Sequence, residues 1–97
     1  MEWTCYALRV PGGHATAPGH FPGRPIVPGA LLLDEVLRLV GAPGPIAFRA
    51  VKFLAPVRHG EALELRCRRE ASGLRRFEIR RAGEETSLLT GTLEDMA

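Results

Sequence analysis

GHFPGRPIVPGALLLDEVLRLVG, from Gly19 to Gly41, is the stretch that decides the fold of this chain. Glycines and prolines recur through its first half. Because proline fixes φ and glycine permits turns, this half predicts a stiff loop that holds His20 in one place. From Pro28 onward the residues are almost wholly apolar, which predicts a helix that is buried on nearly every side and stops at Gly41. Pro28 suits the first position of such a helix.

Two features of this helix indicate a site rather than a purely structural element. The start has no Ser, Thr, Asp or Asn at the cap position, so the first N–H groups, beginning with Gly29, are available to a ligand. Asp34 lies among leucines, where burial would favour the neutral acid. A rise of about 1.5 Å per residue separates Asp34 from Gly29 by roughly 8 Å, so a small substrate could touch both. Glu35 with Arg38 could instead mark an exposed polar face, and the residues alone leave the choice of acid open.

The rest of the chain predicts strands separated by turn residues. In the first strand the buried side chains are either Trp3, Cys5 and Ala7 or Tyr6 and Leu8, together with Val10. A strand, a helix and four further antiparallel strands predict an α+β fold in which a sheet wraps around one central helix, as a single domain over residues 1–97. The expected strands are Glu2–Val10, Ile46–Val57, Glu61–Glu70, Leu74–Arg81 and Thr86–Leu93.

Composition excludes several classes of function. The net charge of +2, without an aromatic platform, argues against nucleic-acid binding. Cys5 and Cys67 match no metal or redox spacing, so free thiols are expected. The function suggested by the motifs discussed next is also expected to need neither a metal nor an organic cofactor. No segment resembles a leader or is long enough to cross a membrane, so we expect a cytoplasmic protein. His14, in the long loop before the helix, is most simply a solvated histidine.

The sequence also resembles a known family over two segments. GHFPGRPIVPG and the helix up to Asp34 resemble the GHFPGxPxxPG signature of the 3-hydroxyacyl-[acyl-carrier-protein] dehydratases of the hotdog fold, the FabZ and FabA families. VKFLAPVRHGEALEL, from Val51 to Leu65, is similar to the VKFxxPVxPGDxLxL segment of the same enzymes. The resemblance implies a lyase of fatty-acid or polyketide-like biosynthesis that acts on substrates held by an acyl carrier protein.

What the resemblance implies for individual residues follows position by position. His20 matches the histidine that removes the α-proton of the acyl thioester, and Asp34 matches the acid that protonates the departing 3-hydroxyl. Gly29 matches the glycine whose N–H binds the thioester carbonyl. In these families the histidine and the acid of one site come from different subunits, which implies a homodimer. Neighbouring positions expected to contact the substrate are Phe21, Pro28 and Ala30.

Some questions stay open from the sequence. The loop is FabZ-like, whereas aspartate at the acid position is FabA-like, so isomerisation of the double bond is undecided. Arginines of the second half are expected on outward strand faces, where some could attract an acidic carrier protein. Small stand-alone dehydratases of aryl-polyene pathways match as well as those of fatty-acid synthesis. The alternatives are a hotdog thioesterase, or a non-catalytic hotdog subunit that pairs with a true dehydratase.

Overall fold

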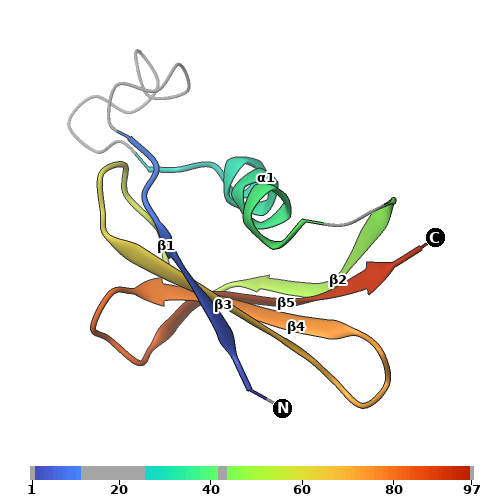
Figure 1. Cartoon of the computed structure of the whole chain (residues 1–97). Helices are drawn as coiled ribbons and strands as arrows, with labels where there is room; N and C mark the ends of the chain where they lie inside the picture. Colours follow the sequence, from blue (N-terminus) through green and yellow to red (C-terminus); the bar gives the residue numbers. More distant parts are fainter. Residues whose placement is uncertain (1, 12–25, 42–43, 97) are drawn as a thin grey trace.

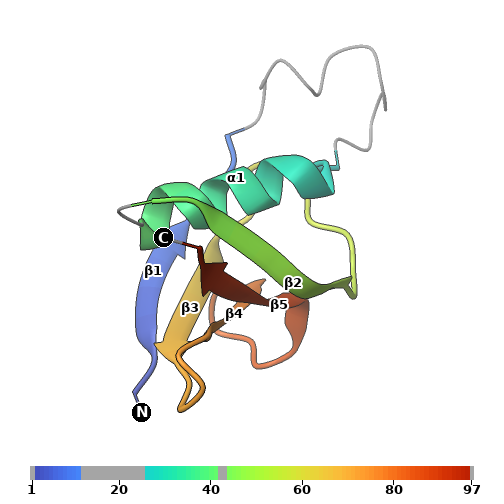
Figure 2. The same ribbon diagram turned by 90° about the vertical axis from the view of Figure 1, so that its right-hand side faces the viewer.

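The computed structural model describes residues 2–11, 26–41 and 44–96 of the chain. One helix lies across one face of a curved antiparallel sheet, and no helix formed by the described residues lies over the other face (Figures 1 and 2). This arrangement confirms the expected α+β fold. The elements in chain order are β1 (Thr4–Leu8), α1 (Gly29–Val40), β2 (Ile46–Phe53), β3 (Leu63–Arg69), β4 (Arg75–Arg81) and β5 (Ser87–Asp95).

The strand order in the sheet is β1-β3-β4-β5-β2, and every neighbouring pair is antiparallel. Strand β2 therefore lies beside the last strand of the chain and forms one edge of the sheet, while β1 forms the other edge. The sequence pattern predicted the strands but not this order. As a result, β1 and β2, which flank the helix in sequence, lie at opposite edges beneath it.

Side chains alternate between the helix-facing and the outer face of the sheet, as the period of a strand requires. In β3 the buried residues are Leu63, Leu65 and Cys67, as predicted from the sequence. Their partners in β1 include Tyr6 opposite Leu65 and Leu8 opposite Leu63, so the second of the two alternatives for the first strand is correct.

Helix α1 is amphipathic rather than buried on all sides, so that expectation was wrong for the single chain. It packs Leu32 and Val36 into the core, and both are almost fully buried. Asp34 is exposed, which contradicts the expected burial of this acid. Pro28 is the N-cap residue instead of the first helical residue, and the helix ends before Gly41 as predicted.

The middle of the core is tightly packed around Phe77. Its side chain is fully buried, and its ring meets the ring of Phe48 edge-on at a centroid distance of 5.8 Å. Gly91 of β5 lies opposite Phe77. A Cβ atom at Gly91 would lie only 2.5 Å from Phe77 Cζ, so this position has no room for a side chain.

The acidic end of the chain is held by arginines rather than simply solvated. Glu94 pairs with Arg49 of β2, and Asp95 accepts a 2.9 Å hydrogen bond from Arg75 of β4. Strand β5 accordingly continues to Asp95, two residues beyond the predicted end at Leu93. Cross-strand ion pairs of this kind stabilise the last residues of β5.

Strand β2 departs from regular alternation. Arg49 pairs with Thr92 and Lys52 with Thr90, so β2 has one residue more than β5 over this interval. Ala50, at this bulge, has a φ of 51°. The alternation predicted for this strand therefore fails after Arg49. In the described part of the chain, no helix is long and apolar enough to span a membrane.

Candidate active site at the helix start

The start of α1 is fixed by contacts between two segments that are distant in sequence. Ile26 forms an isolated antiparallel bridge with Arg58, and the N–H of Val27 donates a 2.8 Å hydrogen bond to the carbonyl of Val57. Val27 and Val57 are both buried. These contacts tie the residues just before the helix to the segment that follows β2, and they determine where Gly29 lies.

A groove with a volume of about 450 Å³ opens beside this helix start. That volume falls within the usual range of small-molecule sites. One wall comes from Val27, Gly29 and Leu32, and the other from the end of β2 and the residues after it, Phe53–Val57. The lining is apolar apart from backbone groups, so the groove suits a ligand with an acyl chain.

Phe53 and Leu54 form the outer rim of the groove and are exposed to an unusual degree for such residues, at 55% and 56%. The sequence pattern had placed both in a strand segment packed on the core, so their role at the groove was missed. The signal was the VKFLAPV segment, because the match to the dehydratase families from Val51 to Leu65 includes every residue of this wall. Their exposure leaves apolar surface at the edge of the sheet uncovered in the single chain.

Gly29 has the geometry of a hydrogen-bond donor to a bound ligand. A Cβ at this position would lie 2.7 Å from Phe53 Cε1, so the ring covers the glycine at close range. The helix has no side-chain cap, and its first bonds run from Leu31 and Leu32 to the carbonyl of Pro28. Within the described residues, the N–H of Gly29 has no acceptor. Free N–H groups at a helix start favour developing negative charge.

Asp34 does not line this groove. It follows Gly29 by five positions, which corresponds to about 140° around the helix axis, and its side chain is exposed. A single chain therefore does not bring the two residues to one small ligand. Glu35 takes the surface role considered for it, because it forms a bidentate ion pair with Arg38 at 3.0 Å.

The other predicted site residues are divided between described and undescribed parts of the chain. His20, Phe21 and the loop residue His14 lie outside the described residues. Pro28 and Ala30 flank Gly29 and are exposed, but neither lines the groove. Of the six predicted residues, Gly29 is the one that the described structure places directly on the groove.

The cysteines are free thiols, as predicted: Cys5 is exposed and Cys67 is buried. Burial raises the pKa of the Cys67 thiol, while the nearby cations of Arg75 and Arg69 lower it less. A thiol in such an environment is a poor nucleophile near neutral pH. Among the described residues, no group of His, Cys, Asp and Glu side chains could hold a metal ion.

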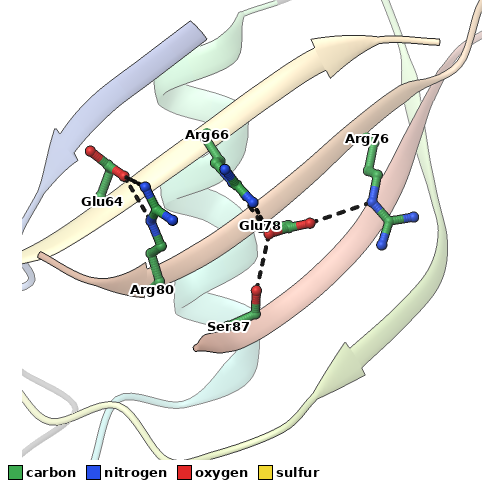
Figure 3. A network of polar contacts seen from close by, with 6 residues as sticks. All are labelled: Glu64, Arg66, Arg76, Glu78, Arg80 and Ser87. Carbon is green, nitrogen blue, oxygen red and sulfur yellow. Dashed lines mark hydrogen bonds and ion pairs between the residues drawn. The ribbon is translucent and has the colours of Figure 1, made fainter. Parts of the chain in front are cut away.

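Several of the arginines form a network on the outer face of the sheet, on the opposite side from α1 (Figure 3). Glu78 lies at its centre. It accepts hydrogen bonds from Arg66 at 2.9 Å and from Ser87 at 3.0 Å, and it lies 3.5 Å from Arg76. Burial raises the pKa of the Glu78 carboxyl, but these hydrogen bonds outweigh burial and hold the pKa below its usual value.

A second ion pair joins Arg80 to Glu64 at 2.7 Å. The guanidinium groups of Arg66 and Arg68 also lie over the ring of Trp3, with their Cζ atoms 4.1 and 4.6 Å from the ring centroid. The outward placement of these arginines confirms the sequence prediction. Arg75 is an exception, because it points towards the helix side, where it donates to the carbonyl of Gly41.

Comparison with known proteins agrees with this geometry. The structure is similar to a chain of the solved structure described as the dehydratase heterocomplex ApeI:P from Xenorhabdus doucetiae. The match covers 95% of this chain and 85% of that chain, with a TM-score of 0.74 and 22% sequence identity. The protein therefore has the hotdog fold. The 3-hydroxyacyl-[acyl-carrier-protein] dehydratase FabZ of Blochmanniella pennsylvanica (strain BPEN) is 35% identical over 75 residues, which cover 61% of this chain and 50% of that relative.

The family assignment comes from a family model. The ApeI-like model, described as ApeI dehydratase, matches residues 2–91. The chain belongs to this family of hotdog dehydratases, as the motifs in its sequence predicted. Its match spans half the length of the FabZ relative.

Proposed function

We propose that the protein dehydrates a 3-hydroxyacyl thioester, carried by an acyl carrier protein in the cytoplasm, to a trans-2-enoyl thioester and water. The observation that carries this proposal is the apolar groove that opens directly on the uncapped helix start at Gly29. A dehydratase of this kind must bind an acyl chain beside a donor for the thioester oxygen, and the groove offers both.

The proposed chemistry uses three groups. His20, as the neutral base, takes a proton from the carbon next to the thioester carbonyl. Negative charge then develops on the carbonyl oxygen, where the N–H of Gly29 and the positive end of the helix stabilise it. Asp34, as the general acid, gives a proton to the 3-hydroxyl, which leaves as water while the carbon–carbon double bond forms. The proton taken by His20 must return to the acid before the next turnover.

We further propose that each site is shared between two subunits in a homodimer. The position of Asp34 supports this arrangement, since its exposed side chain lies away from the groove of its own chain. The exposed Phe53 and Leu54 beside the edge strand β2 support it as well, because a second subunit there would cover apolar surface. In this arrangement Asp34 of one chain would serve the groove of the other.

The test is an absorbance assay for the conjugated enoyl thioester, with a short 3-hydroxyacyl or 2-enoyl thioester as substrate. We expect wild-type protein to interconvert the two and the His20→Ala and Asp34→Asn variants to lose about a hundredfold or more of this rate. Arg38→Gln, which removes a surface charge from the same helix, is the matched control. Full activity in a folded Asp34→Asn variant would refute the assigned role of this acid.

A shared site also makes a subunit-mixing experiment possible. His20→Ala and Asp34→Asn homodimers each lack one half of every site, whereas a mixed dimer retains one intact site. Mixing the two inactive variants should therefore restore up to about half of the activity per mixed dimer. No recovery, with subunit exchange demonstrated by mass spectrometry, would mean that both residues serve the same chain. Release of free thiol in the same assay would instead indicate the thioesterase alternative.

One observation favours a second candidate, a subunit that works only beside a different hotdog chain. The similar structure from Xenorhabdus doucetiae is described as a heterocomplex. If this protein has that role, the isolated chain will be inactive although folded, and adding a partner dehydratase subunit will restore turnover. The Asp34→Asn variant then distinguishes a catalytic contribution of this chain from a purely structural one.

A further inference from the structure

A small hollow on the outer face of the sheet has no role in the proposed reaction. It has a volume of about 120 Å³ and is lined by Ala50 and Lys52 of β2, Arg76 of β4, and Thr90, Gly91 and Thr92 of β5. The bulge in β2 lies at its edge, where Ala50 has a φ of 51°. The small side chain of Ala50 leaves room for the hollow, and Gly91 contributes only backbone atoms to it, because a Cβ at this position would point to the opposite face, towards Phe77.

The side chains around this hollow supply hydrogen-bond donors and no carboxylate. Lys52 contributes an ammonium group, Arg76 a guanidinium group, and Thr90 and Thr92 one hydroxyl each. Within the described residues, the side chains of Lys52, Thr90 and Thr92 form no hydrogen bond or ion pair. Two cations with adjacent hydroxyls can donate charge-assisted and neutral hydrogen bonds to the oxygen atoms of an anion.

Arg76 is only partly used by its acidic neighbour. Its Nε lies 3.5 Å from Glu78 Oε2, the longest contact of that carboxylate, and its side chain is 45% exposed. Arg66 and Ser87 hold Glu78 more closely, at 2.9 and 3.0 Å. The terminal nitrogens of Arg76 are therefore free to face a ligand, while Glu78 holds the base of the guanidinium group in position.

The charges that surround the hollow leave it positive. The nearest acids on the outer face of β4 and β5 are Glu78 and Glu94, and Glu94 is paired with Arg49. Four cations, Lys52, Arg49, Arg66 and Arg76, thus surround two carboxylates. The volume corresponds to about four water molecules, which suits a group of four oxygens around one atom.

We propose that this hollow binds a phosphate group, either free phosphate or the end of a small phosphate ester. Lys52 and Arg76 neutralise its charge from opposite sides of β5, and Thr90 and Thr92 donate to its oxygens from below. The site lies on the face of the sheet opposite α1 and its groove. Phosphate binding is therefore independent of the proposed dehydration, and either can fail without the other.

The test is a titration of the full chain with inorganic phosphate at constant ionic strength, followed by amide chemical shifts in NMR. We expect saturable shifts centred on Ala50, Thr90 and Thr92. The Lys52→Gln and Arg76→Gln variants should each weaken binding about tenfold, the loss of one charge-assisted hydrogen bond. Arg80→Gln, on the outer face of the same strand as Arg76 but paired with Glu64, is the matched control and should bind within about twofold of wild type.

The same titration with glycerol 3-phosphate distinguishes the two sources of the group. Tighter binding of the ester assigns the hollow to phosphate esters, and equal or weaker binding assigns it to free phosphate; both outcomes support the proposal. Shifts that do not saturate, that chloride reproduces, or that Arg80→Gln reduces as much as Arg76→Gln would overturn it.

Discussion

Replacing Gly91 with alanine should destabilise the protein strongly, although the change adds a single methyl group. The new Cβ would lie 2.5 Å from Cζ and 2.8 Å from Cε1 of Phe77, and 3.2 Å from Cγ2 of Val51. Carbon atoms in contact normally lie about 3.5 to 4.0 Å apart, so the ring must move by about 1 Å. Phe77 is fully buried and its ring already contacts that of Phe48, so the packed core offers no free space for this movement.

Overpacking of this kind costs about 1 to 3 kcal/mol of unfolding free energy. For a domain of this size, each kcal/mol lowers the melting temperature by roughly 4 to 8 °C. The Gly91→Ala variant should therefore melt roughly 4 to 24 °C below wild type. Thermal unfolding followed by circular dichroism, at one protein concentration for all variants, measures this difference without a contribution from changed self-association.

A double variant tests the mechanism as well as the size of the effect. Phe77→Leu alone should also destabilise, because it leaves a cavity. In Gly91→Ala/Phe77→Leu the methyl group occupies part of the space that the ring leaves, so the double variant should be more stable than the sum of the single losses by about 0.5 kcal/mol or more. Thr90→Ala, the outward-facing neighbour, is the control. Additive losses, or a Gly91→Ala variant that melts like wild type, would refute the packing argument.

Three further results are expected. Gly29→Ala keeps the backbone N–H and should stay folded, because the exposed ring of Phe53 can swing away from the new methyl group. The methyl group would nevertheless crowd the thioester carbonyl beside that N–H, so enoyl thioester formation should fall about tenfold or more; an unchanged rate would argue against binding of the carbonyl at this position. Glu78 has a lowered pKa in the folded state, so the stability that its charge contributes is present above its unfolded pKa of about 4.3 and is lost as pH falls through the folded value. Denaturant titrations between pH 6 and pH 3, at about half-unit steps, should show that the unfolding free energy falls less in Glu78→Gln than in wild type. An equal fall of the unfolding free energy with pH in both proteins would contradict this role of Glu78. Cys5 should react with a thiol reagent in the native protein whereas Cys67 should not, since Cys67 is buried with a raised pKa; Cys5→Ser should abolish the native reaction.

The fold was predictable because its elements have strong local signals. The apolar run after Pro28 and the stop at Gly41 predicted α1, and the alternation of Leu63, Leu65 and Cys67 predicted the orientation of β3. Such patterns follow from the period of each element and do not depend on the rest of the molecule. The family motifs in the sequence predicted the dehydratase class, and the family match supports that prediction.

Part of the candidate site was predictable in the same way. The absence of a cap residue before Gly29 is a property of the sequence, and the structure retains the uncapped helix start on a groove. The roles of His20 and Asp34 stay predictions. The choice between Asp34 and Glu35 was open from the residues alone, because neighbouring positions on a helix differ only in direction, and direction depends on what packs against each face.

What the sequence by itself determined is therefore local: where the helix and most of each strand run, which residues of β3 face inward, and that the helix start has no capping side chain. Only the tertiary structure decided that β2 lies at the edge beside β5, that Asp34 is exposed in the single chain, and that Phe53 covers Gly29. The physical reason is that these features join residues distant in the chain. Their contacts are set by how the sheet closes around the helix, and no periodicity within one segment encodes that choice.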